Sequence, residues 1–340
     1  MLDIAAGGNP TPWQQVTGAP VTTAEEWPVN DRRVTVDVYM PARRPRAALV
    51  LAPGAAVLGR NEPRLQALAR STARAGFIVA VPELPGMRRL ALSRADADIL
   101  ADALRALHRR WSALPLGIAG ISYGVGPAVI AALEPDLNGK VDFIVSVGGY
   151  HNTDEAIRFI TTGAYRRIGD GRLHRRAPWQ YGRWAFMMAN AHRLRDRHDA
   201  DLLQQAARRK LEDPLAATSD LRVRMGPAAR SILDLVENDD PDKVVHLLAA
   251  LPEYIRQEID ALNLALYDVG SLKATLILVH GRDDPMIPFS ESEALAAAAP
   301  KGRTSLYIAD SIGHVEFNAV SVANAWTMWQ AIDRVLAERR

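Results

Sequence analysis

A serine with glycine two residues before it and two after it is the feature of this sequence that most directly suggests chemistry. Residues 120–124 read Gly-Ile-Ser-Tyr-Gly, a G-x-S-x-G pattern centred on Ser122. Such a turn strains the serine backbone, and a Cβ at either flank would collide across it. The apolar segment Leu116–Ile121 precedes it, and a helical segment from about Tyr123 to Leu133 follows. We therefore predict that Ser122 is a nucleophile held at a strand-to-helix turn.

An acid and a histidine that could activate this serine follow two later apolar segments. Ala274–His280 is followed by Gly-Arg-Asp283-Asp284, and Thr304–Ala309 is followed by Asp-Ser-Ile-Gly-His314. The chain order serine, acid, histidine is typical of enzymes whose nucleophile lies in a G-x-S-x-G turn. A serine hydroxyl becomes a good nucleophile when a histidine accepts its proton, and a carboxylate must orient that histidine.

Alternating strands and helices are predicted to position these residues. Short apolar segments suit strands in the middle of a parallel sheet, and right-handed crossovers then bring their carboxyl ends to one edge. An antiparallel hairpin opens the series. The predicted strands are Val21–Trp27, Arg33–Met40, Ala47–Ala52, Phe77–Val81, Leu116–Ile121, Val141–Val147, Ala274–His280 and Thr304–Ala309; the predicted helices are Glu62–Ala75, Arg94–Trp111, Tyr123–Leu133, Ser290–Ala299 and Ala319–Glu338.

The alternation stops between residues 151 and 270, where helical patterns continue without a convincing strand. We predict an α/β core in two parts, 1–150 and 271–340, with a helical lid or cap inserted as residues 151–270 after the sixth strand. Charge within the insertion is uneven: Arg158–Lys210 carries a formal +9 and Leu211–Asp260 a formal −6. Either these are solvated faces that partly pair with each other, or the basic part attracts anionic substrates or an anionic surface.

These patterns resemble the α/β-hydrolase superfamily, with a serine esterase-like active site and a large helical lid. The resemblance rests on the Gly120–Gly124 turn, the stretch His280-Gly-x-x-Asp284-x-x-Ile-Pro288 and the Gly313-His314 pair. It covers the two core parts, about two-thirds of the chain. The lid sequence does not match a particular subfamily.

The resemblance implies a role for each residue. Ser122 would be the nucleophile, His314 the general base and Asp284 the acid, with its neighbour Asp283 as the rival. The oxyanion hole would use the backbone N–H of Tyr123 and, from the loop after Ala47–Ala52, that of Ala55, with Ala56 as the runner-up. This loop carries Pro53-Gly54 where many relatives have His-Gly.

Substrate contacts are expected from the end of the Val141–Val147 strand and from the insertion. Tyr150 follows that strand, and residues 179–188 form an aromatic and methionine cluster that includes Trp184 and Met187. Such a cluster could roof an apolar acyl pocket, or it could be the core of the lid itself.

Composition narrows the class of protein. The 340 residues, 48% hydrophobic and 24% charged, are ordinary for a globular chain of one large domain. A net charge of +2 gives no reason to expect nucleic acid as a partner. The chain has no cysteine, and no His/Asp/Glu spacing indicates a metal site, so neither a metal nor a cofactor is expected. The oligomeric state is not indicated.

Neither a membrane anchor nor a leader is expected. Residues 114–133 are long enough and uncharged enough to span a bilayer, but they contain two prolines and four glycines around Ser122. The first residues lack the pattern of a signal peptide. We expect a soluble protein, cytoplasmic by default, with an exported form whose leader has been removed as the open alternative.

Three functions remain open on these residues. The first is a hydrolase that cleaves carboxylic esters of small molecules through an acyl-enzyme intermediate. The second keeps the same triad for a peptidase, amidase or acyltransferase. The third is a non-catalytic binding protein on this fold. Haloalkane dehalogenases and epoxide hydrolases use an aspartate where this chain has Ser122, which disfavours both.

Overall fold

A single eight-stranded sheet forms the centre of the computed structural model, which describes residues 12–29, 32–91, 93–310 and 322–339. The strand order is β1-β2-β4-β3-β5-β6-β9-β10; β2 runs antiparallel to both neighbours, and all other pairings are parallel. The opening hairpin and the parallel sheet are thereby confirmed. The strands are β1 (Val21–Val29), β2 (Arg32–Met40), β3 (Ala47–Ala52), β4 (Phe77–Pro82), β5 (Leu116–Ile121), β6 (Phe143–Val147), β9 (Thr275–Gly281) and β10 (Thr304–Ala309).

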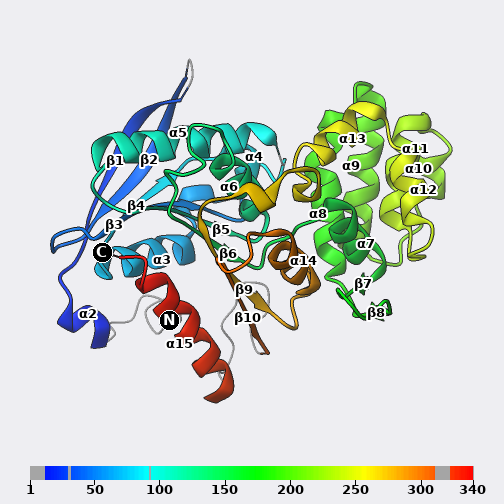
Figure 1. Ribbon diagram of the computed structural model, residues 1–340. Coiled ribbons are helices and arrows are strands. Elements are labelled where there is room, and N and C mark those ends of the chain that lie inside the picture. Colours follow the sequence, from blue (N-terminus) through cyan, green and yellow to red (C-terminus); the bar gives the residue numbers. More distant parts are fainter. Residues whose placement is uncertain (1–11, 30–31, 92, 311–321, 340) are drawn as a thin grey trace.

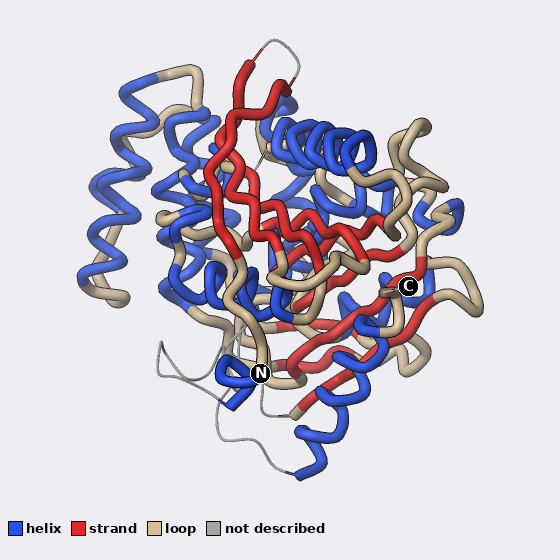
Figure 2. The backbone as a smooth tube through the Cα atoms, turned by 90° about the vertical axis from the view of Figure 1, so that its left-hand side faces the viewer, coloured by secondary structure: helices blue, strands red, loops and turns tan. Residues whose placement is uncertain are grey.

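Helices cover both faces of this twisted sheet (Figures 1 and 2). Successive residues of a strand point to opposite faces, so Val50 and Leu51 belong to different hydrophobic clusters. One face packs against α5 (Arg94–Arg110), α6 (Val125–Ala132) and α14 (Ser290–Ala298), and the other against α3 (Pro63–Arg74) and α15 (Val322–Leu336). Burial on both faces explains why the central strands are wholly apolar. Three short elements are α2 (Pro12–Val16), α4 (Pro85–Arg88) and η1 (Gly59–Asn61).

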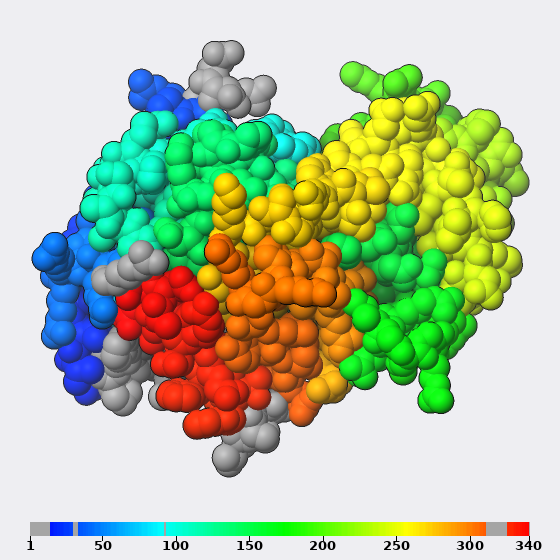
Figure 3. Space-filling view, viewed as in Figure 1, coloured from blue at the N-terminus to red at the C-terminus, as the bar shows by residue number. Residues whose placement is uncertain are grey.

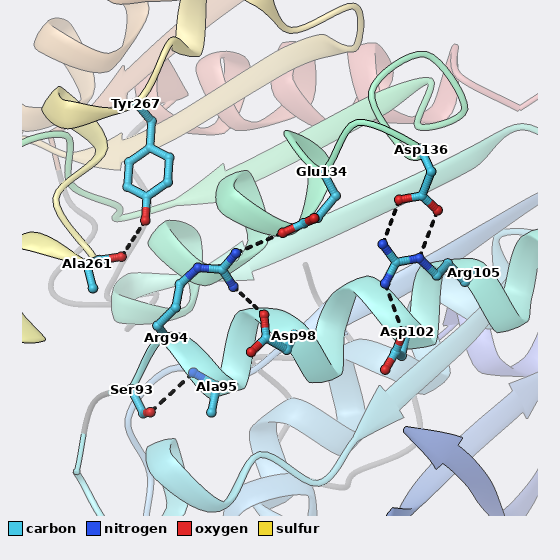
Figure 4. Close-up of polar contacts among 10 residues, drawn as sticks. All are labelled: Ser93, Arg94, Ala95, Asp98, Asp102, Arg105, Glu134, Asp136, Ala261 and Tyr267. Atoms are coloured by element: carbon cyan, nitrogen blue, oxygen red, sulfur yellow. Dashed lines mark hydrogen bonds and ion pairs between the residues drawn. The ribbon is translucent and has the colours of Figure 1, made fainter. Parts of the chain in front are cut away.

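Two arginines of α5 fasten the helix that follows Ser122. Arg94 bonds to Glu134 at 2.8 Å, and Arg105 makes two bonds to Asp136, the shorter of 2.6 Å. Both acids lie just beyond the end of α6, as Figure 4 shows. Bidentate arginine–carboxylate pairs fix orientation as well as distance, so α6 is held in place at the end remote from Ser122.

The insertion folds mainly as helices with a core of its own. It forms a second lobe beside the sheet (Figures 1 and 3). Its hydrophobic cluster is built from α8, α9 and α11 and includes Trp184, Leu203 and Leu233. Its elements are α7 (Thr153–Thr162), β7 (Ala164–Arg166), β8 (Leu173–Arg175), α8 (Gln180–Asn190), η3 (Ala191–Arg193), α9 (Arg197–Glu212), α10 (Ser219–Arg222), α11 (Pro227–Glu237), α12 (Val244–Ala249), α13 (Glu253–Asp260), η4 (Leu264–Leu266) and η5 (Val269–Ser271).

The expectation that the insertion contains no strand is wrong. β7 and β8 form a two-stranded antiparallel sheet within it. Each strand has only three residues, which is too short for the alternation of apolar and polar residues to be recognised. The sequence did contain one indication of a hairpin. The connection between β7 and β8 contains Gly169 and Gly171, which both adopt a positive φ of the kind that hairpin turns use.

None of the helices in the described part of the chain combines the length and the apolar character needed to cross a membrane.

Candidate active site

Ser122 lies at the carboxyl end of β5, in the middle of the sheet. Its φ is +52°, in the left-handed region that side chains other than glycine seldom adopt. Among the described residues, Leu90 is the only other non-glycine residue with a positive φ. A strained backbone of this kind persists only where the surrounding structure enforces it, and such positions cluster at functional sites.

Close contacts explain why glycine flanks Ser122 on both sides. A Cβ at Gly120 would lie 2.6 Å from the Cα of Val125, and a Cβ at Gly124 would lie 2.3 Å from the carbonyl oxygen of Pro53. Both distances are far below van der Waals contact and involve backbone atoms that cannot move independently. The strand, sharp turn and helix expected from the G-x-S-x-G pattern are present as β5, η2 (Ser122–Gly124) and α6.

The loop after β3 packs directly on this turn. A Cβ at Gly54 would be 3.3 Å from the carbonyl oxygen of Ile121 and 3.4 Å from the Cβ of Ser122, so this part of the loop lies close to the serine. Ala55 follows and is exposed, and Ala56 is half-buried. The assignment of the N–H groups of Ala55 and Tyr123 to the oxyanion hole stays a proposal.

The two adjacent aspartates after β9 differ sharply in environment. Asp284 is 1% exposed, and its Oδ1 accepts hydrogen bonds from the N–H groups of Met286 (2.7 Å) and Ile287 (3.1 Å). The side chain of Asp283 is 61% exposed and pairs with Arg176 at 2.9 Å. A buried carboxylate held by backbone donors is pre-oriented, whereas an exposed one is screened by water.

Asp284 faces the end of β6, the strand between β5 and β9. A Cβ at Gly148, directly after β6, would lie 3.4 Å from the Oδ2 of Asp284. Neighbouring strands are roughly 4.8 Å apart, so the loops after β5 and β9 are separated by about two such spacings. One side chain between them could contact both Ser122 and Asp284.

His280, near the end of β9, supports the loop of residues 282–288 that carries Asp284; we call this segment the acid loop. His280 is 1% exposed, and its Nε2 lies 3.0 Å from the carbonyl oxygen of Ile287, so Nε2 carries the proton and donates. Its Nδ1 then accepts from the hydroxyl of Ser292 at 2.7 Å. The same Nε2 is 3.6 Å from the Oδ2 of Asp284. This ring fixes the loop that presents Asp284.

His314 lies outside the described residues. The chain leading towards it leaves the sheet next to the acid loop: β10 ends at Ala309, whose carbonyl oxygen accepts the N–H of Arg282 at 2.7 Å. The following residue, Asp310, bonds to the Nε of Arg282 at 2.5 Å. The role of His314 as general base therefore remains a proposal.

Helix α8 of the insertion makes a hydrogen bond to the core near each of its two ends. At one end, the N–H of Trp179 donates to the carbonyl oxygen of Pro285 at 3.0 Å, in the acid loop. At the other end, the amide of Asn190 donates to the carbonyl oxygen of Leu90 at 2.7 Å, beyond β4. β9 and β4 lie on opposite sides of β5, each two strands away. Helix α8 is therefore joined to segments that follow strands on both sides of β5.

The structure places Trp184 and Met187 inside the lobe rather than on the face of α8 that carries Trp179 and Asn190. Both are buried, at 3% and 4% exposure, in the cluster shared with α9 and α11. At 100° per residue, Arg183 and Phe186 lie closest to the face that carries Trp179 and Asn190, and Trp184 points away from it. Gly182 abuts Met286 of the acid loop, while Phe186 is 39% exposed.

Three aromatic residues of this cluster are exposed: Trp179 (49%), Tyr181 (53%) and Phe186 (39%). Phe186 shares the face of Trp179, and its place seven residues later was visible in the sequence. The choice between the faces of α8 required the two anchoring contacts.

Tyr150 is buried beneath the turn and stacks on Tyr123, with ring centroids 5.9 Å apart. Burial raises the pKa of Tyr123 well above its usual value, and the nearby Tyr150 and Asp96 raise it further. Burial also raises the pKa of Asp96 to about 6. The structure therefore makes Tyr150 a support for Tyr123, and a direct contact of Tyr150 with substrate stays a proposal.

Glu291, at the start of α14, ties the acid-loop side of the site to the loop after β6. It is 4% exposed and accepts the N–H groups of His151 (2.9 Å) and Asn152 (2.7 Å). Burial raises the pKa of Glu291 from 4.5 to about 7, although the two backbone donors act in the opposite direction. The folded protein therefore binds this proton more tightly than the unfolded chain does.

This difference predicts a loss of stability as the pH rises. The contribution of Glu291 is fully present below pH 4.5 and is lost as the pH passes about 7, a change of about 3 kcal/mol. Glu291→Gln keeps an acceptor and removes the titration, so its unfolding free energy should change less over this range. Urea unfolding at pH 5 and pH 8 measures the difference. Glu293→Gln, on the same helix but partly exposed, is the control; identical pH dependence in the wild type and Glu291→Gln would contradict the prediction.

Within residues 12–29, 32–91, 93–310 and 322–339, no group of three or more His, Asp or Glu side chains is arranged to hold a metal ion.

The sheet order, the turn at Ser122 and the buried acid after β9 define the α/β-hydrolase fold, and this chain has it. No protein-family model matches the sequence, and no curated protein matches it. Solved structures do match. A proposed hydrolase from Legionella pneumophila is 14% identical with a TM-score of 0.57, covering 100% of this chain and 94% of that one.

Enzymes of different activities share the fold. Dienelactone hydrolase from Anabaena variabilis is 14% identical with a TM-score of 0.51, covering 95% of this chain and 100% of that one. An acylaminoacyl peptidase is 13% identical with a TM-score of 0.54, and the match covers 96% of this chain but 42% of that one. Identities this low show the fold alone.

Proposed function

We propose that this protein is a serine hydrolase that cleaves carboxylic esters through an acyl-enzyme intermediate. The observation that carries the proposal is the strained Ser122, with φ +52°, at the same sheet edge as the buried and backbone-bonded Asp284. Backbone strain of this kind clusters at functional sites. A serine held in a strained G-x-S-x-G turn is the nucleophile in serine hydrolases that use this turn.

Each residue has one task in the proposed reaction. The Oγ of Ser122 attacks the ester carbonyl carbon while His314 accepts the hydroxyl proton. Asp284 holds the imidazole in the required tautomer and stabilises its charged form. The N–H groups of Tyr123 and Ala55 stabilise the oxyanion. His314 then protonates the departing alcohol, and a water activated by the same imidazole releases the acid and restores Ser122.

The insertion acts as a lid in this proposal. Helix α8, anchored on the acid loop and beyond β4, limits access to Ser122, and Phe186 contributes an apolar surface for the acyl group. A lid that excludes water strengthens the electrostatic stabilisation of the oxyanion. Trp184 and Met187 then act indirectly, by holding α8 in position from the far side.

A panel of chromogenic substrates tests the proposal. The purified protein should hydrolyse p-nitrophenyl esters, with kcat/KM varying with acyl length, and should react covalently with a fluorophosphonate probe. Faster turnover of the matched p-nitroanilides would favour a peptidase or amidase. Preferential transfer to added alcohols would favour an acyltransferase. Absence of both labelling and turnover would leave a non-catalytic protein.

A further inference from the structure

The β7–β8 hairpin (residues 164–175) has one face that packs on the core and one that does not. The register pairs Tyr165 with His174, and these rings stack with centroids 5.3 Å apart. Tyr165 also makes edge contacts with Phe159 and Phe289, at 5.9 and 6.0 Å between centroids. Because residues directly opposite in an antiparallel pair share a face, Tyr165 and His174 define the inner face.

The outer face combines positive charge with aliphatic surface. The register pairs Arg166 with Leu173 and Ala164 with Arg175, all on the face turned away from the aromatic cluster. Ala164 is fully buried, so the accessible part of this face is formed by the other three residues. Arg166 and Arg175 are exposed, and Leu173 is 37% exposed. Beyond the strands, the connection adds the exposed side chains of Ile168 (57%) and Arg172.

In the part of the chain that the structure describes, the guanidinium groups of Arg166, Arg172 and Arg175 form no ion pair, whereas Arg167 pairs with Glu293 at 2.7 Å. The one carboxylate of the connection, that of Asp170, accepts the backbone N–H of Arg172 at 3.0 Å and pairs with His174 at 2.7 Å. The tip is surrounded by solvent, since a Cβ at Gly169 or Gly171 would meet nothing within 4 Å. Figure 3 shows this bright green segment projecting from the lower right of the molecule.

The hairpin is fastened to the acid loop rather than loosely attached. Arg176, directly after β8, pairs with Asp283 at 2.9 Å and also donates to the carbonyl oxygen of Arg282. Arg167 reaches Glu293 on α14. A surface that binds the outer face would therefore be held at a fixed position next to the loop that carries Asp284.

We propose that the outer face of the β7–β8 hairpin docks on an anionic phospholipid membrane. Three guanidinium groups that form no ion pair with the described residues complement lipid phosphates, and guanidinium binds phosphate in a bidentate manner. Ile168 and Leu173 distinguish a membrane from other polyanions: they can enter the boundary between headgroups and acyl chains, whereas nucleic acid would leave them in water. The docked hairpin places the loop that carries Asp284 next to the lipid surface.

Vesicle flotation with the full-length protein tests the proposal. We expect binding to mixed phosphatidylcholine–phosphatidylglycerol vesicles that weakens as salt rises, and little binding to phosphatidylcholine alone. The variant R166A/R172A/R175A should lower the partition coefficient roughly 100-fold. The variant I168S/L173S, which retains every charge, should lower it roughly 10-fold. Both should keep wild-type circular dichroism and wild-type turnover of a soluble p-nitrophenyl ester.

A matched control removes the same charge elsewhere. Arg33, Arg43 and Arg44 are exposed and, among the described residues, form no ion pair, so R33A/R43A/R44A should bind vesicles like the wild type. Equal losses in the control and the hairpin variant would overturn the proposal, as would absence of binding to anionic vesicles by the wild type. A third outcome would also overturn the proposal: vesicle binding that I168S/L173S leaves unchanged, together with equally tight binding of duplex DNA. That result would indicate a site for polyanions in general.

Discussion

Ser122→Ala is expected to lower kcat for p-nitrophenyl ester hydrolysis about 10⁶-fold, to the level left by substrate binding and the oxyanion hole. Alanine removes the attacking oxygen and retains the backbone, so the strained turn should persist with φ near +52°. The melting temperature should therefore stay close to that of the wild type. Labelling by a fluorophosphonate probe should disappear with the activity, since both require the same oxygen.

Ser146→Ala is the matched control for this variant. Ser146 is fully buried at the end of β6, and its Oγ has no hydrogen-bond partner among the described residues. Removing it should leave kcat within a few-fold of the wild type and leave probe labelling intact. If Ser122→Ala keeps its turnover and labelling, the nucleophile lies elsewhere and the proposed mechanism is wrong.

Asp284→Asn is expected to lower kcat about 10⁴-fold, because an amide opposite the imidazole favours the wrong tautomer and cannot stabilise the charged ring. The asparagine carbonyl can still accept the N–H groups of Met286 and Ile287, which now bond to Oδ1 at 2.7 and 3.1 Å. The acid loop should therefore keep its shape, and KM should change much less than kcat. Steady-state kinetics across pH, with circular dichroism as a check on folding, measure this effect.

Asp283→Asn separates the two adjacent acids. The side chain of Asp283 is 61% exposed and forms a surface ion pair with Arg176. Exposed pairs of this kind contribute about 0–1 kcal/mol to stability, so activity should stay within a few-fold of the wild type. A larger loss from Asp283→Asn than from Asp284→Asn would transfer the role of the acid to Asp283.

Local patterns in the sequence were sufficient wherever the structure depends on neighbouring residues. The G-x-S-x-G spacing predicted the turn at Ser122, because the collision that demands glycine at Gly120 is with Val125, close by in the chain. The collision at Gly124 is with Pro53, and only the folded chain shows it. Uniformly apolar segments predicted the parallel strands, because burial on both faces removes the alternation of polar and apolar residues. Serine, acid and histidine in this chain order then indicated a common sheet edge.

The sequence by itself determined the class of fold, the strained serine and the short set of residues from which an acid could come. Only the tertiary structure decided which aspartate is buried, which part of α8 meets the loop after β9 and where a basic hairpin projects. Each of these depends on contacts between segments far apart in the chain, such as Trp179 with Pro285 or Arg176 with Asp283. Such contacts leave no periodic pattern in the local sequence, because they are stabilised by the packing of helices and strands against one another.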